Sequence, residues 1–265
     1  LAQEGLASWQ GFIFPPVDVV FGGTPQVLTV SPRERIELAK TVLLSPDIKV
    51  TEMEALENKI FVEEELAALV VGIGGLATYP SIVSAQNGLL HGTKTTIHEW
   101  LHQFLFFRPL GRNYWRTPEM TTLNETAVTL ASEELADRVY EAITGEKPSR
   151  PLEKEEEEGA FSFGREMRQT RLRVEELLAL GMVVEAERYM EQRRQLFLNR
   201  GYHIRKLNQA YFAFFSVYAD NPASISPIHD ELVRFRDTTG SVGDFIRQIA
   251  RFGRYPEFKF RLEGN

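Results

Sequence analysis

Residues 94–107 read KTTIHEWLHQFLFF, and the apolar positions of this segment recur at the spacing of an α-helix. The positions that would face the core are Trp100, Leu101, Phe104 and Leu105. Pro109 and Gly111 follow the segment and predict that the helix ends near Phe107. The pattern therefore predicts a helix that packs into the core through its aromatic and leucine side chains.

The same helix carries the motif HExxH at residues 98–102. Residues four apart project from one face of a helix, so His98 and His102 can reach a single ion at zinc–nitrogen distances of ~2.0–2.1 Å. Glu99 lies about 100° around the helix from His98, where it can accept a proton from a water molecule held by the metal. Chance produces this motif in on the order of one chain in a hundred of this length. The motif therefore predicts a metal site with its own catalytic base.

The composition restricts the ligands and the partners of such a site. The chain has 265 residues, 43% of them apolar, which is enough for one large core or two modest ones. It contains no Cys and only five His, so a transition metal must be bound by His, Asp or Glu. The net charge of -7 gives no general attraction to nucleic acid or to anionic lipid head groups. We therefore expect no nucleic-acid partner.

The beginning of the chain bears on its compartment. Leu1 stands where a Met would be expected, which we interpret as the removal of a leading signal peptide or membrane anchor, or as a choice of cloning boundary. The compartment stays open, with an extracytoplasmic or membrane-anchored location slightly favoured over a cytoplasmic one. Residues 66–90 carry no charge over the length of a membrane span, but their Gly, Pro, Gln and Asn residues favour a buried helix end, a turn and a strand.

Strands and helices are predicted to alternate before the HExxH helix. Residues 17–21 and 27–30 read as extended segments bounded by Gly and Pro. A capping-box pattern that begins at Ser31 predicts a helix over residues 31–44, although the β-branched residues there also allow a strand.

A second capping box, Thr51 with Glu54, predicts a helix that runs to about Val71. Residues 76–84 then read as a strand, and Pro80 places this strand at the edge of a sheet. An edge strand offers free backbone hydrogen-bonding groups.

The remainder of the chain is predicted to be mostly helical. Helices are expected at 122–143, 165–180, 183–199 and 203–219, and a last helix from the capping box at 241–244. We expect an α+β protein with an α/β catalytic part at 1–145 and a helical C-terminal subdomain at 160–265 that completes the cleft. The acidic segment 146–159 between them reads as a linker or loop.

A catalytic zinc usually has three protein ligands, so one more ligand must come from outside the motif. Asn124-Glu125 lies early in the next predicted helix, and the competing carboxylates are Glu119, Glu133 and Glu134. With an HExxH helix followed by an Asn-Glu pair on a second helix, the chain resembles the gluzincins, a superfamily of zinc metallopeptidases that includes thermolysin. The resemblance implies Glu125 as the third ligand and a zincin-like fold for the N-terminal part.

The resemblance also implies how ligands and substrate are held. Thermolysin-like members have an Asp one turn after the third ligand, which steadies a ligand His, whereas this chain has Thr129 there. Ser132 or Glu133 is predicted to do that job instead. The edge strand, residues 75–84, occupies the position that pairs with an extended peptide substrate in gluzincins.

Gluzincins further use a Tyr or a His from their helical part to stabilise the oxyanion that forms during hydrolysis. Tyr211, which shares a helix face with Asn208, is predicted for this role, and a core tyrosine with a satisfied hydroxyl is the alternative interpretation. Tyr202, His203 and Tyr218 are the remaining competitors for the role.

These features predict a zinc metallopeptidase that binds about one Zn²⁺ per chain through His98, His102 and Glu125 and acts on peptides or proteins. Glu99 and Tyr211 would be the catalytic residues. An alternative is a non-catalytic zincin-like binding or scaffold module with a structural zinc, attached to a membrane through a segment that precedes Leu1. A metal-dependent hydrolase of a non-peptide amide is a third reading, because HExxH reports the chemistry and not the substrate.

Overall fold

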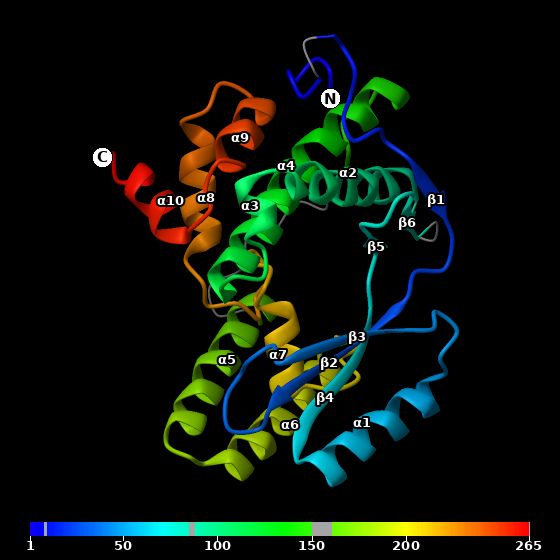
Figure 1. Ribbon diagram of the computed structural model, residues 1–265. Helices are drawn as coiled ribbons and strands as arrows, with labels where there is room; N and C mark the ends of the chain where they lie inside the picture. Colours follow the sequence, from blue (N-terminus) through cyan, green and yellow to red (C-terminus); the bar gives the residue numbers. More distant parts are fainter. Residues whose placement is uncertain (8–9, 85–87, 150–160, 265) are drawn as a thin grey trace. The chain divides into compact units, whose positions relative to one another are not determined.

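The computed structural model describes residues 1–7, 10–84, 88–149 and 161–264. It has the predicted α+β class, with small sheets and helices in the N-terminal part and a mostly helical C-terminal part (Figure 1). The chain forms two compact units: unit 1 contains residues 1–24, 74–151 and 227–265, and unit 2 contains residues 25–73 and 152–226. Most of the predicted linker 146–159 lies outside the described residues, and the predicted domain boundaries stay predictions.

Unit 1 is built around two long helices. Its elements are β1 (Val19–Phe21), β5 (Gly75–Leu76), β6 (Ser81–Val83), α2 (Gly88–Phe106), α3 (Pro109–Arg112), α4 (Pro118–Thr144), α8 (Ile228–Asp237), α9 (Val242–Ile249) and α10 (Tyr255–Leu262). The strands form one small sheet in the order β1-β6-β5, with β1 parallel and β5 antiparallel to β6. α2 packs along α4 (Figure 1).

Side-chain hydrogen bonds attach α2 to its surroundings in unit 1. The amide of Gln103 donates to Ser81 Oγ at 2.8 Å and to the carbonyl of Thr78, which ties the helix to the small sheet. The indole of Trp100 donates to the carbonyl oxygen of Pro15 at 2.8 Å. These three bonds are made by Trp100 and Gln103, which lie in the turns that carry His98 and His102, so they help to set the orientation of the HExxH helix.

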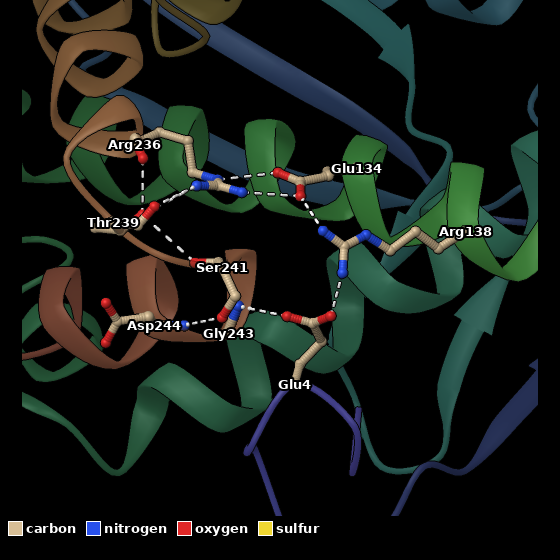
Figure 2. A network of polar contacts seen from close by, with 8 residues as sticks. All are labelled: Glu4, Glu134, Arg138, Arg236, Thr239, Ser241, Gly243 and Asp244. Atoms are coloured by element: carbon tan, nitrogen blue, oxygen red, sulfur yellow. Dashed lines mark hydrogen bonds and ion pairs between the residues drawn. The ribbon is translucent and has the colours of Figure 1, made fainter.

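A network of charged groups ties the N-terminal segment of unit 1 to α4 and α9 (Figure 2). The carboxylate of Glu4 pairs with Arg138 and accepts from the backbone N–H of Gly243 at 3.1 Å. Glu134 continues the network, at 2.5 Å from Arg138 and 2.9 Å from Arg236. A Cβ on Gly243 would run into the carbonyl oxygen of Glu4, so glycine is required where the two segments meet.

Unit 2 is a three-stranded antiparallel sheet with helices. Its elements are β2 (Gln26–Pro32), β3 (Lys40–Leu44), β4 (Leu66–Gly72), α1 (Val50–Glu64), α5 (Phe163–Ala179), α6 (Val183–Asn199) and α7 (Gln209–Phe215). The strand order is β3-β2-β4. β4 is buried on both faces, because Ala68 and Val70 pack with Ile60 of α1 while Ala67 and Leu69 pack with Ala210 of α7.

This burial explains one error of the sequence prediction. The helix predicted over residues 51–71 begins one residue early, at Val50, and the carboxylate of Glu52 accepts from the backbone N–H of the N-cap residue Lys49 at 2.8 Å. It ends at Glu64, because Glu65 adopts a left-handed conformation with φ 55. The apolar run that follows is the edge strand β4, and a run buried on both faces lacks the alternation that distinguishes a strand from a helix.

The helix predicted over residues 31–44 is also wrong. β2 continues through Pro32, and β3 occupies residues 40–44. Ser31 does not cap a helix, because its hydroxyl lies in the turn after β2 and accepts from the N–H of Glu37 at 3.1 Å. Strand pairing with β4 thus overrides the local capping pattern.

The single edge strand predicted over residues 76–84 is divided into β5 and β6 by a turn that contains Pro80. β5 is an edge strand, whereas β6 is the central strand of its sheet. Since Pro80 lies in the turn, it does not mark an edge within a strand. None of the helices in the described residues is long and apolar enough to cross a membrane, and the uncharged segment 66–90 contains β4, β5, β6 and the beginning of α2.

The helical predictions were more accurate. α4, α5 and α6 match the predicted helices closely, and Ser241 caps α9 by accepting from the N–H of Asp244 at 3.1 Å. The helix predicted over residues 203–219 is limited to α7, which begins after its cap Asn208. α8 and α10 were not predicted.

Candidate metal centre

Three potential ligand atoms converge in unit 1, between α2 and α4. The Nε2 atoms of His98 and His102 lie 3.1 Å apart, and Glu125 Oε2 lies 3.5 Å from the first and 3.4 Å from the second. A tetrahedral ion with ligands at ~2.0–2.1 Å requires its ligand atoms to be about 3.3–3.4 Å apart. The donor set and its spacing therefore fit a zinc ion, and the group could hold a metal ion.

Local structure explains why these side chains meet. His98 and His102 are one turn apart on α2, and the opposite side of the helix is buried through Trp100, Leu101 and their apolar neighbours. α4 begins at the cap Thr117, whose hydroxyl accepts from the N–H of Met120 at 3.3 Å. Glu125 therefore sits in the third turn of a helix that packs along α2.

Glu125 has the environment of a metal ligand rather than of a surface carboxylate. Its side chain is buried, and Oε2 has no hydrogen-bond partner of good geometry. Burial alone would raise the pKa of Glu125, but the nearby His102 and His98 outweigh it and hold this pKa far below its usual value. Burying a carboxylate oxygen that faces two imidazole nitrogens costs free energy of folding unless a proton or a cation lies between these atoms.

Both imidazoles face the carboxylate of Glu125. Burial lowers the pKa of His102, but the charge of Glu125, its hydrogen bond and the charge of Glu99 outweigh this effect and raise the pKa. The two residues predicted to steady a ligand His have other partners: the hydroxyl of Ser132 donates to the carbonyl of Thr129 at 2.9 Å, and Glu133 pairs with Lys94 at 2.5 Å.

Glu99 lies on α2 between the two His residues and is only 7% exposed. Burial raises the pKa of its carboxyl group, an effect that His98 and His102 reduce but do not cancel. The carboxylate packs directly against β5, because a Cβ on Gly75 would collide with Glu99 Oε1 and lie 2.7 Å from Thr95 Cγ2. Gly75 thus allows the edge strand to approach Glu99 closely.

The competing carboxylates do not lie in this cluster. Glu119 is exposed in the first turn of α4, and Glu133 and Glu134 make the ion pairs already described, with Lys94 and with Arg138 and Arg236. Of the described carboxylates, Glu125 is the one grouped with the two His residues.

Tyr114 is a residue of this site that the sequence analysis missed. Its hydroxyl donates to Glu125 Oε1, and its ring meets the ring of His102 edge-on at 6.2 Å. Tyr114 lies in the turns between α3 and α4, where no periodicity indicates which way a side chain points. The bond to Oε1 leaves Oε2 facing the imidazoles.

Tyr211 lies on α7 of unit 2, next to β4. Its ring packs against Phe215, with ring centroids 4.6 Å apart, and burial raises the pKa of its hydroxyl to about 12. Among its competitors, Tyr202 stacks on Phe163 at 4.5 Å. The oxyanion role of Tyr211 stays a prediction.

Comparisons of the chain with protein-family models, with curated proteins and with solved structures found no match.

Proposed function

We propose that this protein is a zinc-dependent peptidase in which His98, His102 and Glu125 bind the metal and Glu99 is the catalytic base. One observation carries the proposal: three ligand atoms stand at the mutual distances of a tetrahedral zinc site, with the carboxylate of Glu99 on the same helix. A structural zinc site normally has four protein ligands, whereas three ligands leave a position for water. The resemblance of HExxH and Asn-Glu to the gluzincins agrees with this reading.

The proposed reaction is the hydrolysis of an amide bond. When bound, a zinc ion would polarise the substrate carbonyl and lower the pKa of a water molecule. The water oxygen forms a bond to the carbonyl carbon while Glu99 accepts one of the water protons. Glu99 then delivers this proton to the amide nitrogen as the carbon–nitrogen bond breaks.

The substrate would bind as an extended peptide beside Glu99. β5 supports this placement because its only strand partner among the described residues is β6, and because Gly75 lies against the carboxylate of Glu99. Tyr211 remains our candidate for stabilising the oxyanion.

The deciding experiment compares Glu99→Gln with the parent protein. Gln keeps the size of the side chain but cannot accept the proton, so we expect the variant to bind about one zinc per chain and to lose at least ~10³-fold in turnover of a mixed peptide library. Glu119→Gln is the matched control, since it removes an exposed carboxylate from α4, and it should leave both quantities unchanged.

The metal ligands are tested by measuring the zinc content of purified His98→Ala and Glu125→Ala proteins. Zinc content that is undiminished in either variant would remove that residue from the proposed ligand set. A parent protein that binds zinc, cleaves no peptide and unfolds when the metal is removed would favour the scaffold function instead. Cleavage by Glu99→Gln at the parental rate would refute the mechanism.

A further inference from the structure

An exposed aromatic surface lies beside the C-terminal end of α2 in unit 1. It consists of Phe14, Phe106 and Phe107, whose rings contact one another, with Phe12 from the segment of Phe14 and Trp115 from the turns after α2, and we call these five residues the aromatic corner. Their exposed fractions are 69% for Phe12, 57% for Phe14, 67% for Phe106, 46% for Phe107 and 76% for Trp115. Single exposed apolar residues are common, but a group of aromatic rings at one place on a surface marks an interaction site.

The aromatic corner is held in place by packing and hydrogen bonds. The ring of Phe107 lies 5.2 Å from that of Phe14 and 5.3 Å from that of Phe106. The bond from Trp100 to the carbonyl of Pro15 fixes the segment that carries Phe14. The rings are therefore presented to solvent by a fixed backbone.

Trp115 belongs to the turns that follow α2 and fold back on its end. Gly111 packs so closely against the backbone of Leu105 that a Cβ there would lie 2.7 Å from the N–H nitrogen of Phe106. The ring of Trp115 meets that of Tyr114 at 4.5 Å. These contacts keep Trp115 near the end of α2.

The charge around the aromatic corner is opposite to that of the whole chain. Residues 100–118 contain Arg108, Arg112 and Arg116 but no Asp or Glu, and residues 5–17 contain no charged residue at all. Arg112 and Arg116 are exposed, while Arg108 is half-buried, with its guanidinium 3.3 Å from the centre of the Phe104 ring. A chain with a net charge of -7 thus carries the aromatic corner on two segments, one cationic and one uncharged.

We propose that the aromatic corner docks on the surface of a lipid bilayer that contains anionic lipids. Aromatic rings with neighbouring arginines match the two layers of such a surface, because the rings enter the interfacial region while the guanidinium groups meet the phosphates. A second copy of the chain is a poorer occupant, since a symmetric contact would bring the arginines of both copies together.

The test is co-sedimentation of the whole protein with vesicles of phosphatidylcholine alone or of equal parts phosphatidylcholine and phosphatidylserine. The parent should bind the anionic vesicles more tightly, and raised salt should weaken this binding. Arg112→Gln with Arg116→Gln should reduce affinity for anionic vesicles by about 25-fold, at about five-fold per arginine. Phe106→Ser with Trp115→Ser should reduce it by at least about ten-fold.

Phe260→Ser with Arg261→Gln is the matched control. It removes the same kinds of side chain from the exposed side of α10, also in unit 1, and should bind vesicles like the parent. The proposal would be overturned if the parent bound both kinds of vesicle equally or bound neither. It would also be overturned if both corner variants bound vesicles like the parent. The proposal would also be overturned if sedimentation equilibrium showed that the aromatic corner mediates concentration-dependent dimerisation instead of vesicle binding. Vesicle binding needs neither zinc nor hydrolysis, so its outcome is independent of the proposed function.

Discussion

Among single residues, Tyr114 is the one outside the three proposed ligands that most directly orients a ligand of the metal centre. Its hydroxyl donates to Glu125 Oε1 and thereby turns Oε2 toward His98 and His102. A hydrogen bond of this kind reduces the freedom that a ligand loses when it binds metal.

We predict that Tyr114→Phe weakens zinc affinity by about 10–100-fold, the size typical of outer-shell partners. The measurement is competition with a chromophoric chelator, and the thermal stability of the metal-free protein should change little. Tyr140→Phe is a suitable control because Tyr140 lies on α4, the helix of Glu125, about 22 Å further along its axis than Glu125. An unchanged affinity in Tyr114→Phe would mean that packing alone orients Glu125.

At the level of elements, β5 and α2 approach each other through Gly75. The strand supplies backbone rather than a side chain at this contact, and the carboxylate of Glu99 occupies the place of a Cβ. A larger residue must therefore move either the strand or the catalytic base.

Gly75→Ala should lower turnover by roughly ten-fold or more while zinc binding persists. A displacement of a catalytic group by about 1 Å is enough to slow the reaction strongly. It should also destabilise the fold by about 1–3 kcal/mol through overpacking. Gly92→Ala makes the same substitution within α2, where the nearest side-chain atom is 3.9 Å away, and should stabilise the protein by roughly 0.5–1 kcal/mol. Parental kinetics in Gly75→Ala would show that β5 can retreat without moving Glu99.

For the whole molecule, both units contain buried carboxylates among the described residues, but Glu57 of unit 2 lies outside the group of potential metal ligands that includes Glu125 of unit 1. Glu57 of unit 2 accepts from the N–H of Val70 at 2.7 Å and pairs with Arg205 and Lys206. Burial would raise the pKa of Glu57, but the bonds from Arg205 and Lys206 outweigh it, so this pKa is lowered. Glu57 joins α1, β4 and the segment before α7 and is a structural group.

Glu57→Gln should therefore destabilise the protein by about 2–3 kcal/mol at neutral pH and leave the zinc content unchanged. A lowered pKa means that the carboxylate stabilises the fold above the unfolded value of about 4.3 and loses this contribution as the pH falls through the lower folded value. Urea unfolding at several pH values should thus show the difference between parent and variant shrinking below about pH 4. A difference that grows in acid would contradict the assignment.

The sequence by itself determined the features that depend on neighbours along the chain. The HExxH helix, the Asn124-Glu125 helix and the pair α5 and α6 were predicted because helical periodicity and capping are set by residues three or four positions apart. The arrangement of His98 and His102 on one helix face follows from the same spacing. That much of the candidate site is local.

Only the tertiary structure decided which distant groups meet. It brought Glu125 rather than Glu119, Glu133 or Glu134 to the two His residues, and it placed Tyr114 on Glu125. It also made residues 66–72 a strand, because pairing with β2 and burial on both faces outweigh an apolar pattern that suits a helix equally well. Strand pairing and ligand convergence are contacts between segments far apart in sequence, and their free energy depends on packing that no local pattern encodes.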